Sequence, residues 1–154
     1  MSLMTRENSR RDFLGFAAAG TAAAIIVSTP AHATPENVAA EIKKLFGDKV
    51  PQEGKIKLDL PTIAENGLVV PLAFEVESPM TEQSYVKSVH FFADENPSPG
   101  IASFYFTPMI PKASGAIRIR LAKTQNIVAV AEMSTGEVYK TQREVKVTIG
   151  GCGG

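Results

Sequence analysis

Short runs in which apolar and polar residues alternate follow one another from Lys55 almost to the C-terminus. A period of two places every second side chain on the same face, as in a half-buried β-strand. Several short strands separated by loops with proline or glycine are typical of a two-sheet, immunoglobulin-like sandwich, so we expect an all-β domain of about seven strands. The predicted strands are residues 55–60, 70–76, 85–93, 101–107, 116–122, 127–133 and 138–149.

Three segments within this pattern predict how the strands are arranged. Pro71 lies inside the run 70–76, and a proline within a strand favours an edge position or a bulge because it has no N–H to donate. The proline-rich segment 96–100 is expected to carry the chain from one sheet to the other. Segments 65–67 and 134–137 have the composition of turns.

The outward and inward faces of two strands can also be predicted. Arg118 and Arg120 alternate with apolar residues and are expected to form a solvated strand face. A docking surface for a partner domain or a sulfur oxyanion, shared with Glu144 and Lys146, is the alternative. The core-facing residues of the last strand are expected to be Val145, Val147 and Ile149.

A short helix is predicted before the strands, at residues 34–47. Thr34 is a favourable N-cap, Pro35 suits the first helical position, and Gly47 is a typical stop. We expect this helix to cover one edge of the domain with one apolar face, formed by Val38, Ile42, Leu45 and Phe46.

The N-terminus has the features of an export signal. Arg10 and Arg11 form a twin-arginine motif, an apolar alanine-rich run follows, and small residues then predict cleavage between Ala33 and Thr34. The apolar run is shorter than the roughly 20 residues that span a membrane, so we do not expect a membrane anchor. Residues 1–33 are therefore predicted to be a cleaved twin-arginine signal peptide, and the mature protein to be periplasmic.

The composition of the mature chain limits its ligands. Removing the signal takes three basic and two acidic side chains from 16 of each, which leaves 13 and 14. This balance gives no electrostatic reason to bind nucleic acid or an anionic membrane. His90 and Cys152 would be the only histidine and cysteine of the mature chain, too few for a metal-binding cluster, so no metal and no cofactor are expected. His90 itself is expected to face solvent or to be hydrogen-bonded locally. Because the twin-arginine pathway exports folded proteins, a protein partner is the better explanation for its use.

The chemistry is expected at the last five residues, 150–154, where the single cysteine of the chain is flanked by glycines. Glycine has no Cβ, so this segment cannot build a pocket around the thiol and is predicted to be a flexible carrier arm. Five extended residues reach roughly 17 Å. A free cysteine with a pKa near 8.5 is only about 3% thiolate at pH 7. The thiol is therefore expected to be a substrate handle for other enzymes, with no catalytic residue in this chain. The arm comprises Gly150, Gly151, Cys152, Gly153 and Gly154.

The residues of the C-terminal segment alone leave other interpretations open. The chain could be a structural or interaction module whose terminal cysteine only forms an intermolecular disulfide. A modifier activated at its Gly-Gly carboxylate would be cytosolic, which conflicts with the signal, and a thiol enzyme would need a base.

Several motifs of this chain resemble the SoxY family of the periplasmic sulfur-oxidising system. The most specific is the C-terminal sequence 145–154, VKVTIGGCGG, and the twin-arginine signal is a further similarity. The resemblance covers nearly the whole chain. The other motifs that carry it are 63–67, 78–81, 104–108 and 117–122.

This resemblance implies partners and a role for the thiol. SoxY is an immunoglobulin-like sandwich that forms a heterodimer with SoxZ, so a SoxZ-like subunit is implied here. Cys152 aligns with the cysteine that carries the pathway intermediates, which implies three partner enzymes. These are a c-type haem enzyme that conjugates thiosulfate, a manganese-dependent hydrolase that releases sulfate, and a sulfane dehydrogenase.

Overall fold

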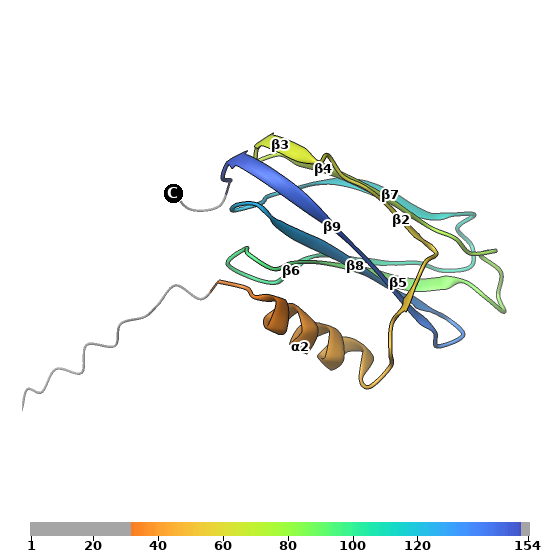
Figure 1. The fold of residues 1–154 in the computed structure, drawn as a ribbon. Coiled ribbons are helices and arrows are strands. Elements are labelled where there is room, and N and C mark those ends of the chain that lie inside the picture. The colour runs from red at the N-terminus through yellow and green to blue at the C-terminus, as the bar shows by residue number, and fades with distance from the viewer. Residues whose placement is uncertain (1–31, 152–154) are drawn as a thin grey trace, which may run out of the picture.

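The computed structural model describes residues 32–151, in which one helix and two sheets form three layers (Figure 1). The expected two-sheet sandwich is confirmed. Among the described residues it has nine strands: the seven that were predicted and two short ones, β1 and β3, that were not. The elements are α2 (Pro35–Phe46), β1 (Gln52–Glu53), β2 (Ile56–Asp59), β3 (Ile63–Asn66), β4 (Val70–Val76), β5 (Val86–Ala93), β6 (Gly100–Tyr105), β7 (Ala113–Ile119), β8 (Gln125–Met133) and β9 (Val138–Ile149).

The larger sheet has the strand order β1-β9-β8-β5-β6, and the smaller sheet has the order β2-β4-β7. Antiparallel pairs connect β9 to β8, β8 to β5 and β5 to β6, whereas the short strands β1 and β3 pair with β9 in parallel. β9 is the longest strand and crosses the whole sandwich, from its hairpin with β8 to its end beside β3 (Figure 1). The end of β9 is therefore held by β3, a segment from the first half of the chain.

The central strands β5 and β8 are buried on both faces. Alternate residues such as Phe91 and Ile127 face the core between the sheets, while Phe92 and Val128 face the helix. This explains why both strands are nearly continuous apolar runs in the sequence. Phe74 of β4 lies across the core from Phe91, with ring centroids 5.0 Å apart.

The helix was expected to cover one edge of the domain, but α2 covers the outer face of the larger sheet (Figure 1). Thr34 Oγ1 accepts a hydrogen bond from the Asn37 N–H at 3.3 Å, and the Gly47 N–H donates to the Lys43 carbonyl oxygen at 2.8 Å. Both predicted caps are thus confirmed. Leu45, which was predicted to lie on the apolar face, is 49% exposed. The residues that pack between helix and sheet are Val38, Ile42, Phe46, Phe92, Val128, Val130 and Val138.

Three predictions about connections and faces were wrong. Segment 96–100 does not cross between sheets, because β5 and β6 pair with each other in the same sheet. Segment 65–67 is only partly a turn, because Glu65 and Asn66 belong to β3. Ile149 is 67% exposed because it lies at the end of β9, beyond the part of the sandwich that covers Val145.

The expected edge position or bulge at Pro71 was wrong for the strand as a whole. β4 is the middle strand of its sheet, but β2 pairs only with residues 73–76 of β4. Pro71 therefore has a neighbour on β7, Arg118, and none on β2. The missing N–H of the proline is accommodated where one side of the strand is open.

Candidate functional site: the base of the C-terminal arm

The predicted site residues fall on both sides of the boundary of the described region. Gly150 and Gly151, which we call the arm base, directly follow β9. Cys152, Gly153 and Gly154 lie outside the described residues, as do Arg10 and Arg11 of the export signal. At the predicted cleavage site, Ala33 is buried and Thr34 caps α2.

Three backbone hydrogen bonds join the end of β9, Gly67, Leu121 and the arm base, and one of them is made by the arm base itself. The Gly67 N–H donates to the Ile149 carbonyl oxygen at 2.7 Å, and the Leu121 N–H donates to the Gly67 carbonyl oxygen at 2.8 Å. The Gly151 N–H in turn donates to the Leu121 carbonyl oxygen at 2.8 Å. Three segments that are distant in the sequence thus meet at one point, directly before Cys152.

Glycine is required at this point because the backbones approach too closely for a Cβ atom. A Cβ at Gly150 would collide with the carbonyl oxygen of Ala122, and one at Gly151 would collide with the backbone of Gly67. A Cβ at Gly67 would collide with the Leu121 carbonyl oxygen and lie 2.8 Å from the Gly151 nitrogen. We call the backbone of Gly67, Leu121 and Ala122 the glycine slot.

This geometry changes the interpretation of two glycines. From the sequence, Gly150 and Gly151 were expected to give the thiol reach as part of a flexible arm, residues 150–154. In this structure they are docked against the domain, and their missing side chains permit close backbone contact. A flexible arm that carries Cys152 stays a prediction.

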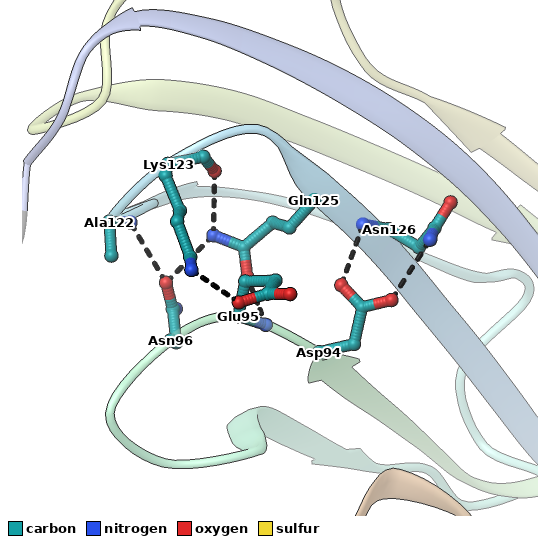
Figure 2. A network of polar contacts seen from close by, with 7 residues as sticks. All are labelled: Asp94, Glu95, Asn96, Ala122, Lys123, Gln125 and Asn126. Carbon is teal, nitrogen blue, oxygen red and sulfur yellow. Dashed lines mark hydrogen bonds and ion pairs between the residues drawn. The ribbon is translucent and has the colours of Figure 1, made fainter. Parts of the chain in front are cut away.

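The segment that forms one side of the slot is fixed by a buried polar network (Figure 2). Asn96 is 8% exposed, and its Oδ1 accepts hydrogen bonds from the Ala122 N–H at 2.9 Å and from Gln125 Nε2 at 2.8 Å. Its Nδ2 donates to the Arg120 carbonyl oxygen at 2.9 Å. One side-chain amide therefore holds the residues immediately before and after Leu121.

The rest of the network connects the two loops around the slot. The Gln125 side-chain oxygen accepts a hydrogen bond from the Glu95 N–H at 3.0 Å. Lys123 Nζ lies 2.6 Å from a carboxylate oxygen of Glu95 (Figure 2). Beside them, both carboxylate oxygens of Asp94 accept hydrogen bonds from Asn126. Each of these bonds joins the loop after β5 to the residues before and at the start of β8.

The end of β9 is held on both sides, by the segment before β3 and by the segment before β8. The Lys146 N–H donates to the Thr62 carbonyl oxygen at 3.0 Å, and the Val147 N–H donates to Thr124 Oγ1 at 2.9 Å. These bonds and the pairing with β3 hold β9 as far as Ile149. The arm base is therefore the first part of the C-terminal segment that does not pair with a strand.

The charged residues considered for a docking surface lie on different elements. Arg118 and Arg120 are exposed, as expected for a solvated face, but Arg118 is on β7 of the smaller sheet and Arg120 directly follows that strand. Glu144 and Lys146 are on β9 of the larger sheet. The alternative of one shared surface stays a prediction.

His90 is hydrogen-bonded locally, which is one of the two expected outcomes. It is buried on β5, its Nδ1 lies 2.8 Å from Ser103 Oγ, and the Phe46 ring of α2 covers it. Burial lowers its pKa, while the Glu132 carboxylate acts in the opposite direction. His90 thus belongs to the contact between helix and sheet.

Two further observations concern ligands and membranes. Among residues 32–151, no three His, Cys, Asp or Glu side chains lie together as metal ligands would. In the same part of the chain, no helix combines the length and apolar character needed to cross a membrane. The expectation that the protein has no cofactor remains a prediction.

Sequence reasoning did not find Gly67, Leu121 or Asn96 as site residues. Gly67 carried the signal of a turn, and Leu121 carried that of a strand residue. Neither signal reveals a contact with Gly151, because that contact depends on how distant segments are brought together. Asn96 was assigned to a loop with the wrong course.

Comparisons with known proteins support the relationship that the motifs predicted. Residues 42–152 match the family described as "Sulfur oxidation protein SoxY", and residues 7–26 match the twin-arginine translocation pathway signal. A solved structure of the sulfur carrier protein SoxY from Chlorobium limicola f thiosulfatophilum is similar, with a TM-score of 0.63 and 36% identity. The match covers 74% of this chain and 98% of that one.

Two more distant structures share the fold alone. A superoxide reductase (neelaredoxin) from Ignicoccus hospitalis has a TM-score of 0.51 and 15% identity, over 75% of this chain and 94% of that one. A putative superoxide reductase from Thermotoga maritima has a TM-score of 0.53 and 12% identity, over 65% and 95%. No match is found among curated proteins. Because the family match spans well over half of the chain and the first solved relative is 36% identical, this chain belongs to the SoxY family of sulfur oxidation proteins.

Proposed function

We propose that this protein is a covalent carrier of sulfur-oxidation intermediates, which are bound through the thiol of Cys152. One observation carries the proposal: the match to the SoxY family extends to Cys152 itself. The similar protein from Chlorobium limicola is described as a sulfur carrier, which supports the same role. The twin-arginine signal supports export to the periplasm.

The proposed loading step forms a sulfur–sulfur bond and needs an oxidant. The thiol of Cys152 and thiosulfate lose one proton and one electron pair and give a cysteine S-thiosulfonate. The c-type haem enzyme of the system would accept the electrons. Water then attacks the terminal sulfonate, the S–S bond to it breaks, and sulfate, a proton and a cysteine persulfide are formed. The manganese-dependent hydrolase would catalyse this step.

The remaining sulfane sulfur would be oxidised by the sulfane dehydrogenase or handed on. In this proposal the carrier is not an enzyme, because the groups that hold the arm base are backbone N–H and carbonyl groups, which are poor acids and bases. It needs no cofactor of its own. A SoxZ-like subunit would be its constant partner, as the family implies.

Intact mass spectrometry of the mature protein from the native periplasm tests the proposal. Under thiosulfate-fed conditions we expect additions of sulfur, sulfonate or thiosulfonate units that a reductant removes. The variant Cys152→Ser should lack all of them while keeping the melting temperature of the wild type. A clean thiol, or only a symmetric disulfide, would instead indicate a structural module.

A further inference from the structure

We propose that Gly67, with Leu121 held by Asn96, positions the carrier arm by docking Gly151 in the glycine slot. This inference rests on the proposed function of Cys152, but its structural part can be tested without any sulfur chemistry. It gives a role to three residues that lie between 31 and 85 positions before the thiol in the sequence.

The contacts of Gly151 are specific in both shape and hydrogen bonding. Its N–H is directed to the Leu121 carbonyl oxygen, and its Cα lies so close to Gly67 that neither residue has room for a side chain. Gly67 is buried, and both its N–H and its carbonyl oxygen are hydrogen-bonded. A backbone segment without side chains can therefore enter the slot, and a segment with a Cβ at this position cannot.

The slot is formed by the fold and does not depend on the arm. Asn96 holds the carbonyl of Arg120 and the N–H of Ala122, which fixes the direction of the intervening Leu121 carbonyl. The Leu121 side chain is fully buried in the main core. The acceptor for Gly151 is thus held from two sides, by an amide and by apolar packing.

Docking would determine how far the thiol extends from the domain. With Gly151 in the slot, the Cα of Cys152 lies about 3.8 Å from the last docked Cα, the distance across one peptide bond. An arm that is free from Gly150 onward would reach roughly 17 Å. Docking would therefore keep the thiol near the domain, and release would let it extend into a partner's active-site cleft.

Both states are expected to be accessible in solution. One backbone hydrogen bond at the surface is only modestly favourable net, so the docked form should exceed the released form by only a few-fold. The docked arm base should therefore exchange with a released form. A partner enzyme that binds the extended arm would shift this equilibrium toward release.

Hydrogen exchange at the Gly151 amide, measured by NMR on the mature full-length chain, tests the proposal. In the wild type we expect slower exchange than for an unstructured glycine. In Gly67→Ala we expect this exchange to become roughly fivefold faster, as for the loss of one backbone hydrogen bond. The matched control is Gly100→Ala, because a Cβ at Gly100 would meet no atom within 4 Å and exchange at Gly151 should stay unchanged.

A second variant and a second readout separate positioning from folding. Gly151→Ala leaves Gly67 in place, yet its methyl group would collide with the Gly67 backbone, so the arm base should be displaced from an intact domain. In both variants a bulky maleimide should react with Cys152 several-fold faster than in the wild type. An unprotected Gly151 amide in the wild type, or unchanged exchange and reactivity in folded variants, would overturn the proposal.

Failure of this inference is distinguishable from failure of the proposed function. If sulfur adducts form on Cys152 although the Gly151 amide is unprotected, the carrier role stands and the slot is refuted. If the amide is protected but no adduct forms, the slot stands and the carrier role is refuted. Repeating the exchange measurement in Cys152→Ser excludes an effect of a thiol adduct on the docking.

Discussion

The helix α2 and the arm base are attached to the same sandwich at opposite ends of the mature chain, but by different interactions. α2 buries Val38, Ile42 and Phe46 against the larger sheet. The arm base, Gly150 and Gly151, buries no side chain and is attached through backbone contacts alone. Apolar burial of about 1.5 to 3 kcal/mol for each large side chain makes a contact permanent, whereas one hydrogen bond contributes about 1 kcal/mol net. The comparison suggests a fixed segment at one end and a releasable one at the other.

The largest effect is expected from the helix. Phe46→Ala removes a ring that is 6% exposed and contacts His90, with ring centroids 5.4 Å apart. Because a cavity would remain between helix and sheet, we expect the free energy of unfolding to fall by about 3 kcal/mol, measured by urea denaturation. Leu45→Ala on the same helix is the control and should change stability by less than about 0.5 kcal/mol. Equal losses for the two variants would mean that the helix is not fixed by its apolar face.

A smaller effect is expected from truncation of the arm. A chain that ends at Ile149 loses the Gly151 N–H that donates to the Leu121 carbonyl oxygen. We expect this to lower the free energy of unfolding by about 1 kcal/mol, measured in the same denaturation assay. A chain that ends at Gly151 keeps the bond and should be as stable as the full-length protein. If the two truncations are equally stable, the arm base contributes nothing to the domain.

The part of the fold that could be predicted is the part in which a local pattern reflects burial. The run 70–76 alternates because only one face of β4 reaches the core, and its bounds were predicted correctly. β3 has no such alternation of apolar residues, so its pairing with β9 could not be foreseen. The course of segment 96–100 was predicted wrongly because proline and glycine indicate a loop but not the strand to which it leads.

In the candidate site, too, some features can be predicted from a local motif and others depend on contacts between distant segments. Cys152 and its flanking glycines form a motif that can be read without a structure, and the family relationship follows from it. The docking of Gly151 depends on Gly67 and on Leu121, which are brought to it only by the completed sandwich. A glycine that permits close approach and a glycine that provides flexibility look the same in a sequence.

The smallest effect, a dependence on pH, should distinguish the two attachments once more. Burial lowers the pKa of His90 below its ordinary value of 6.5, despite the Glu132 carboxylate, which itself pairs with Lys49 and Lys87. As the pH falls through 6.5, the unfolded chain therefore takes up the proton first, and stability falls until the folded-state pKa is reached. His90 is the only histidine that the mature chain would retain, so its contribution can be isolated.

We expect the wild type to lose somewhat more unfolding free energy than His90→Gln between pH 7 and pH 5, by less than about 1 kcal/mol. Because His90 lies beneath Phe46, exchange of the α2 amides should become faster at the lower pH, after correction for intrinsic rates. The arm base is held by backbone groups that do not titrate in this range, so the protection of Gly151 should stay constant. A parallel loss of protection in both segments would show that they open together, and would contradict the separation of a fixed helix from a releasable arm.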